Sequence, residues 1–384
     1  MPKQRKKSKK IYLIIGSILL FVAIFAGGIS LGYILFKSKG ENVPTKESEI
    51  EKDVYIEFLS EVYDKIQENY WQKTTDEELS NLFGLASEKI TAIPQTLDNK
   101  NKEGLKEMLT KIMENMQENQ KKEFSATLAH IVLQNLQPLG RSGLYTQKEK
   151  EDLQEKVQNI NPETGQVETT VYTKLVRPDI LYLYIERMSP TTLDDLKSET
   201  EKVDKGETLD TLILDLRGNI GGSLDILLYL LGPFIGQNQY AFEFFHQGEY
   251  QPFKTKIGWL PSLVRYKKVV ILIDENSQSS AEVMATTLKK YNVGILVGTK
   301  SKGWGTAEKV YEIKNQIASD EKYSLFLVHS LTLREDYQPI EGNGVEPTIN
   351  INGSDWKKQL LAYFNDNNLI QAVEEIWDGS PGKI

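Results

Sequence analysis

The chain contains no cysteine among its 384 residues. This absence excludes disulfides, zinc–thiolate sites and cysteine nucleophiles. Histidine is scarce as well, since only His130, His246 and His329 occur. No cluster with metal-ligand spacing is visible, so we expect neither a metal centre nor a cofactor.

Charge is missing from residues 11–36, which follow a basic stretch, residues 1–10, that holds six Lys or Arg and no acid. A membrane helix needs about 20 apolar residues, whereas the core of a signal peptide has roughly 7–15. We therefore expect one transmembrane helix with its N-terminus in the cytoplasm, and everything after it outside the cytoplasm. Cleavage near Ala26 and a buried core helix are the alternatives.

The net charge is −8 although the first ten residues are strongly basic. An acidic body is a poor partner for nucleic acid, because its field repels the phosphate backbone. We expect no nucleic-acid binding. The membrane is the expected partner of residues 11–36.

The rest of the chain divides into three segments that differ in composition and in the spacing of their apolar residues. Residues 37–52 are polar and broken by Gly40 and Pro44, which predicts a linker. Four apolar stripes with helical spacing predict a helical subdomain over residues 53–153. We expect the stretch 100–137 within it to brace the fold or bind a partner, and self-association would suit this subdomain.

From residue 168 onward, apolar strands alternate with helices, which predicts an α/β fold for a core over residues 168–352. Residues 353–384 are expected to add C-terminal helices. The expected strands cover residues 181–185, 211–216, 269–273, 294–297, 309–313 and 323–333.

Two loops in this core carry candidate chemistry. Residues 215–222 read DLRGNIGG and leave a buried strand, so their glycines let the backbone approach a bound group. Residues 274–282 read DENSQSSAE and place three serines at a helix start. Each loop also has a purely structural interpretation: the first as a turn, and the second as a capping box in which Ser279 caps the helix and Glu282 returns the bond.

In combination these segments resemble the carboxy-terminal processing, or tail-specific, serine peptidases of the S41 type. The resemblance also rests on Val297-Gly298, on residues 303–306 (GWGT) and on residues 344–347 (GVEP), which follow in family order. It covers about residues 54–90 and 175–352. It implies a crotonase-like core that cleaves unstructured chain ends with a serine nucleophile and a lysine base.

The resemblance assigns the nucleophile to Ser279. It assigns the oxyanion donors to the N–H of Ser280 and to the turn at Gly221 and Gly222. Unfolded or C-terminal polypeptide segments are the partners that it implies.

The chain departs from the family at the base. The family's Gly-Lys-Gly-Thr run reads GWGT here, so Trp304 holds the lysine position, and Glu308 replaces a supporting glutamine. An indole cannot accept the serine proton. Lys302 is a displaced candidate base, because residues i and i+2 share a face of an extended strand. A Ser277–Lys302 pair, with Ser277 as an alternative nucleophile, would keep the family's sequence spacing.

A second departure concerns substrate capture. The family usually inserts a PDZ domain before its core, but only residues 154–170 separate the helical subdomain from the core here, too few for any domain. Three hypotheses follow. The chain is an active membrane-anchored endopeptidase, an inactive relative that binds chain ends or scaffolds a protease, or a crotonase-type enzyme for acyl ligands. Trp304 favours lost or much reduced hydrolysis.

Overall fold

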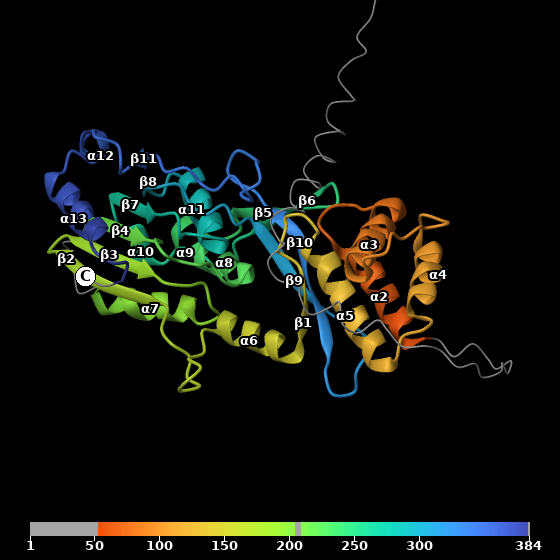
Figure 1. The fold of residues 1–384 in the computed structure, drawn as a ribbon. Helices are drawn as coiled ribbons and strands as arrows, with labels where there is room; N and C mark the ends of the chain where they lie inside the picture. The colour runs from red at the N-terminus through yellow and green to blue at the C-terminus, as the bar shows by residue number, and fades with distance from the viewer. Residues whose placement is uncertain (1–52, 204–208, 383–384) are drawn as a thin grey trace, which may run out of the picture. The chain divides into compact units, whose positions relative to one another are not determined.

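A computed structural model describes residues 53–203 and 209–382 (Figure 1). Within these two ranges, no helix has the length and apolar character needed to cross a membrane. The expected basic tail, transmembrane helix and linker at residues 1–10, 11–36 and 37–52 lie outside the described residues.

Four helices follow the four apolar stripes that the sequence shows. Asp53 caps the first helix by accepting hydrogen bonds from the N–H groups of Tyr55 and Ile56, and Thr75 forms a capping box with Glu78 on the second. The helices are α2 (Val54–Asn69), α3 (Asp76–Thr91), α4 (Lys102–Met113) and α5 (Glu118–Gln134).

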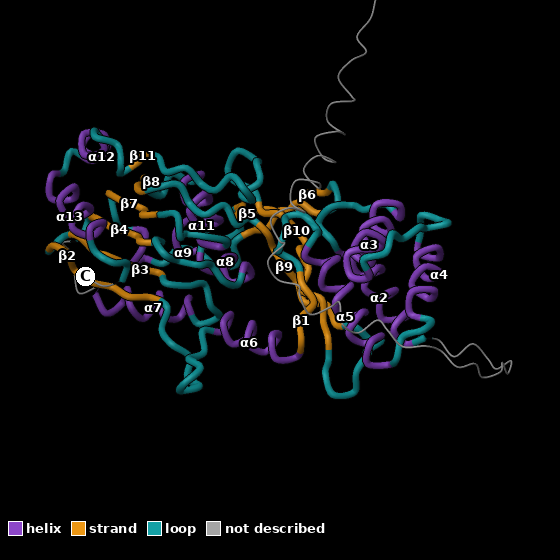
Figure 2. Tube along the Cα trace, viewed as in Figure 1, coloured by secondary structure: helices purple, strands orange, loops and turns teal. Residues whose placement is uncertain are grey.

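These helices lie beside an antiparallel sheet (Figure 2). The helical region and that sheet share one apolar core. Phe58 and Leu128 from the helices and Leu325 from the sheet are completely buried in it. The strand order is β1-β10-β5-β6, with β9 paired to β10. The strands are β1 (Gly143–Thr146), β5 (Tyr240–His246), β6 (Glu249–Lys254), β9 (Thr306–Glu312) and β10 (Tyr323–Thr332).

A second, mainly parallel sheet forms the α/β core, in the order β11-β8-β7-β4-β3-β2. Its central strand β4 is buried along its whole length, which explains the apolar run there. The strands are β2 (Val171–Arg177), β3 (Ile180–Ile185), β4 (Thr211–Asp215), β7 (Lys268–Ile273), β8 (Ile295–Gly298) and β11 (Ile349–Asn350). The strands expected at 309–313 and 323–333 belong instead to the antiparallel sheet.

Helices cover both faces of the parallel sheet. One face packs against α7 (Thr192–Val203), α8 (Leu224–Leu230), α9 (Gly232–Ile235), α10 (Pro261–Val264) and α11 (Ser280–Lys290). The other face packs against α12 (Trp356–Phe364) and α13 (Asn367–Asp378). Between β1 and β2 the chain forms only α6 (Gln147–Gln158), which buries no residue, and a hairpin closed by Ile160 and Val167.

Candidate active site

The two loops with candidate chemistry leave the carboxyl ends of neighbouring parallel strands, β4 and β7. Hydrogen bonds join them directly: Gly218 N–H donates to Asp274 Oδ1 (2.9 Å), and Gln278 N–H donates to the Asn219 carbonyl (2.9 Å). The loops therefore form one surface at one edge of the sheet, as parallel pairing requires.

Ser279 occupies the junction between β7 and α11 in an unusual backbone conformation. Its φ is 56° and its ψ is −125°, although it has a side chain that disfavours positive φ. The residue is half-buried. Non-glycine residues held in such conformations cluster at functional sites, where the surrounding structure enforces them.

Gly221 lies directly against this serine. A Cβ atom added to Gly221 would come within 2.6 Å of the Ser279 Cβ and 3.1 Å of its Oγ, so only glycine fits here. The Gly221 N–H is already used, because it donates to Asn219 Oδ1 at 2.8 Å. Gly222 therefore remains as the expected donor from this turn, beside the N–H of Ser280, for a developing negative charge.

Glu282 organises the site, a role that its sequence position did not reveal. The side chain is completely buried. Its Oε2 accepts the N–H groups of Ser279 and Trp304, both at 2.9 Å, and its Oε1 accepts the Gly303 N–H (2.7 Å) and the Ser301 hydroxyl. Burial raises the pKa of this carboxyl, while the four donors act in the opposite direction. The sequence predicted only the bond to Ser279, as half of a capping box.

Trp304 therefore adjoins the serine, since the backbone nitrogens of both residues donate to the same carboxylate oxygen. The guanidinium carbon of Arg141 lies 3.3 Å from the centroid of the Trp304 ring. The Thr306 hydroxyl donates to the carboxyl of Glu308, whose pKa is raised by burial. Neither Arg141 nor its contact was predicted, because nothing in the local sequence marks that residue.

A further ion pair fixes Arg141. Its Nη2 lies 3.2 Å from Glu341 Oε1, and Glu341 Oε2 accepts the Gly305 N–H at 2.8 Å. Both side chains of the pair are mostly buried. Arg141 thus contacts the ring of Trp304 directly, and through Glu341 it is connected to the backbone of Gly305.

Lys302 and Ser277 do not form the arrangement that a shifted catalytic pair needs. The Lys302 side chain is exposed, and its backbone N–H donates to the Ser277 carbonyl at 3.0 Å. Ser277 is completely buried. Its hydroxyl donates to the Leu216 carbonyl (2.8 Å) and accepts the Asp274 N–H (3.0 Å), so it ties the two loops together.

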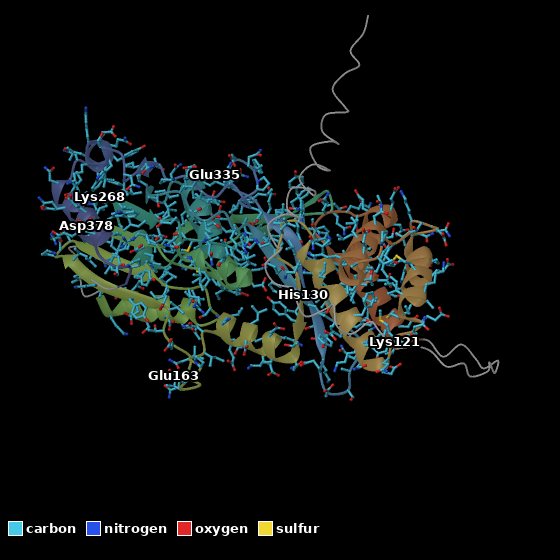
Figure 3. All side chains as sticks on the ribbon, viewed as in Figure 1. Lys121, His130, Glu163, Lys268, Glu335 and Asp378 are labelled. Atoms are coloured by element: carbon cyan, nitrogen blue, oxygen red, sulfur yellow. The ribbon has the colours of Figure 1, made fainter. Side chains whose placement is uncertain are left out.

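The histidines lie in the helical region and its sheet. His130 is on α5 (Figure 3), and the rings of His246 and His329 stack with their centroids 4.3 Å apart between β5 and β10. Burial lowers the pKa of His329 to about 4, which favours its neutral form. Within the described ranges, no three His, Asp or Glu side chains gather as a metal site.

Comparison with known proteins places this core in a family. Residues 179–351 match the family model "Peptidase family S41". A "Probable CtpA-like serine protease" from Staphylococcus epidermidis is 30% identical over 237 residues, which are 62% of this chain and 46% of that protein. A "Carboxy-terminal-processing protease" from Bartonella bacilliformis is 27% identical over 178 residues, or 45% of this chain and 39% of that protein.

Residues 179–351 are therefore homologous to the S41 serine peptidases, and the chain is similar to CtpA-like carboxy-terminal processing proteases. It spans about half the length of the curated relatives that it matches. A structure of a lipoprotein from Streptococcus agalactiae has a similar fold, with a TM-score of 0.51 and 13% identity, over 85% of this chain and 99% of that one. This likeness extends to the mixed α/β fold with its N-terminal helical region.

Proposed function

We propose that this S41 homologue binds unstructured C-terminal segments of extracytoplasmic proteins around Ser279 and hydrolyses them very slowly or not at all. One observation carries the proposal: the position that the family resemblance assigns to lysine holds Trp304, and the guanidinium of Arg141 lies against its ring.

Hydrolysis through a serine needs a group that takes the hydroxyl proton. The indole of Trp304 is a donor only. The carboxylates nearby already accept other bonds, since Glu282 accepts four donors and Glu308 accepts the Thr306 hydroxyl. The exposed side chain of Lys302 is not enclosed beside either serine.

Binding of a chain segment, unlike its hydrolysis, needs no general base. The N–H groups of Gly222 and Ser280 and the N-terminus of α11 offer donors to a peptide carbonyl, and the dipole of α11 favours negative charge there. These features support an S41-type site that still accepts a chain segment.

An active serine endopeptidase is the second candidate, and the conformation of Ser279 favours it. A positive φ at a non-glycine residue is costly, and it is maintained here beside a glycine that fits closely against it. In this alternative, Lys302 acts as the displaced base after the segment around it rearranges.

Incubating the full-length chain in detergent with a labelled unstructured protein separates the two candidates. We expect saturable binding by fluorescence anisotropy and no cleavage that depends on Ser279. The comparison includes Ser279→Ala and Lys302→Ala, with Lys300→Ala as the matched control, because Lys300 is an exposed lysine paired with Glu346 on the same loop. Cleavage that both Ser279→Ala and Lys302→Ala abolish, and that Lys300→Ala retains, would establish the active peptidase.

We also propose that residues 11–36 anchor the protein in the cell membrane as a single span, with the S41 domain outside the cytoplasm. The support is the charge-free run and the six positive charges before it. The cysteine-free sequence makes the test direct. A single cysteine introduced at residue 4 is expected to react with an impermeant thiol reagent only after the cells are lysed. A single cysteine at residue 46 is expected to react in intact cells. Labelling of both in intact cells, or extraction of the protein by alkaline carbonate, would refute the anchor.

A further inference from the structure

The contact between Arg141 and Trp304 connects two parts of the described chain. Trp304 lies between β8 and β9, and its backbone is tied to Glu282 next to Ser279. Arg141 lies between α5 and β1, in the segment that leaves the helical region. The guanidinium carbon lies 3.3 Å from the ring centroid, so the two planar groups are in van der Waals contact.

The helical region determines where Arg141 lies. The Gln137 carbonyl, four residues earlier, accepts the Trp71 indole N–H (2.6 Å) and the Tyr70 hydroxyl at the end of α2. Just after Arg141, the Ser142 carbonyl accepts Gln134 Nε2 at 3.1 Å from α5. Hydrogen bonds thus fix the chain before Arg141 to the end of α2 and the chain after it to α5. Neither helix makes any of the described hydrogen bonds to the Ser279 loop.

The groups that the Arg141 side chain contacts belong to the segments around Trp304 and Glu341. Glu341 pairs with the guanidinium and also accepts the Gly305 N–H. A planar guanidinium suits this combination, because it can stack on an aromatic face and pair with a carboxylate in its own plane. The ring of Trp304 is consequently held by Arg141, while its backbone N–H shares a carboxylate oxygen of Glu282 with the N–H of Ser279.

We propose that the Arg141–Trp304 contact is an autoinhibitory latch: it keeps the indole beside Ser279 and restricts access to the serine until the helical region moves. Opening the latch breaks one cation–π contact and one ion pair, and no covalent bond. The proposal rests on the proposed function only in taking Ser279 as the centre of the binding site.

Access to position 279 can be measured without any polypeptide ligand, because the chain has no cysteine of its own. In the full-length protein, Ser279→Cys introduces a single thiol, and its rate of alkylation by iodoacetamide reports access. Adding Arg141→Ala is expected to raise this rate about 10-fold, the change expected from a partly desolvated cation–π contact. Arg177→Ala is the matched control, because Arg177 also forms an ion pair, with Glu375, on the edge strand β2.

Two further variants separate a latch from general loosening of the fold. In a Ser279→Cys/Trp304→Ala background, Arg141→Ala should have no additional effect, because the indole that it holds is gone. Glu341→Gln, a milder change, should raise the rate about 3-fold, since it removes only the charge of the ion pair. An unchanged rate with Arg141→Ala, or an equal increase with and without Trp304, would overturn the latch.

The failures of the two proposals are distinguishable. Faster alkylation upon Arg141→Ala without binding of any unstructured protein would support the latch and contradict the polypeptide-binding function. Binding of such a protein with alkylation rates insensitive to Arg141 would support the function and contradict the latch.

Discussion

Replacing Trp304 by lysine together with Glu308 by glutamine is expected to give hydrolysis of an unstructured protein at least about 100-fold above the unaltered chain. A correctly placed general base contributes roughly 10²- to 10⁴-fold. Position 304 adjoins Ser279, because both backbone nitrogens donate to Glu282. The measurement is the initial rate of peptide-bond cleavage at saturating substrate.

Glu308→Gln is included because it removes a negative charge near position 304. Glu308 is a half-buried carboxyl near position 304, so it would pair with a new ammonium group there and keep that group protonated. Glutamine keeps a hydrogen-bond acceptor without the negative charge. Trp304→Lys alone is therefore expected to gain less than the double variant, and Arg141 would further favour the neutral amine.

Two controls define the outcome of this prediction. Adding Ser279→Ala to the double variant must abolish the activity, because otherwise another enzyme in the preparation is responsible. A folded double variant that gains nothing would mean that the site differs from an active S41 site beyond the base, for example in its oxyanion donors.

Arg217→Ala is expected to lower the free energy of unfolding by about 3–5 kcal/mol, the usual cost of leaving one member of a buried ion pair alone. Arg217 and Asp215 are almost fully buried and joined by hydrogen bonds of 2.8–3.1 Å. The guanidinium also donates to the carbonyls of Ile376 and Trp377, which holds the end of α13 against the sheet.

Chemical denaturation followed by far-UV circular dichroism measures this change. Arg177→Ala is again the matched control, and its expected cost is below about 1 kcal/mol because its ion pair with Glu375 is partly exposed. A loss of less than about 1 kcal/mol for Arg217→Ala would show that the Asp215–Arg217 pair does not hold α13 in place. Loss of peptide binding is expected to accompany unfolding, because the pair lies in the loop 215–222, which is hydrogen-bonded to the Ser279 loop.

Much of the candidate site was predictable, because its two loops are continuous in sequence. Buried strands followed by glycines and serines predicted residues 215–222 and 274–282, and parallel pairing of β4 with β7 brings them together. The same reasoning undervalued Glu282, since a helix cap explained its position without the contacts to Gly303 and Trp304.

The fold was predictable in class and less so in its division into sheets. Alternating strands and helices predicted an α/β core, but the periodicity of a strand does not say which partner it pairs with. Thus β9 and β10 joined β1 and β5 in an antiparallel sheet under the helices. The apolar stripes of the helices had indicated a partner surface without identifying it.

The sequence by itself determined the absence of thiol chemistry, the charge-free run at 11–36, the α/β class, the resemblance to S41 peptidases and the loss of the lysine at position 304. These are properties of residue identity and local spacing. Only the tertiary structure brought Arg141 against the ring of Trp304 and left the Lys302 side chain exposed. It also engaged the Ser277 hydroxyl in a hydrogen bond to the Leu216 carbonyl. Such contacts depend on how elements distant in the chain pack, and no local pattern records the direction in which a side chain finally points.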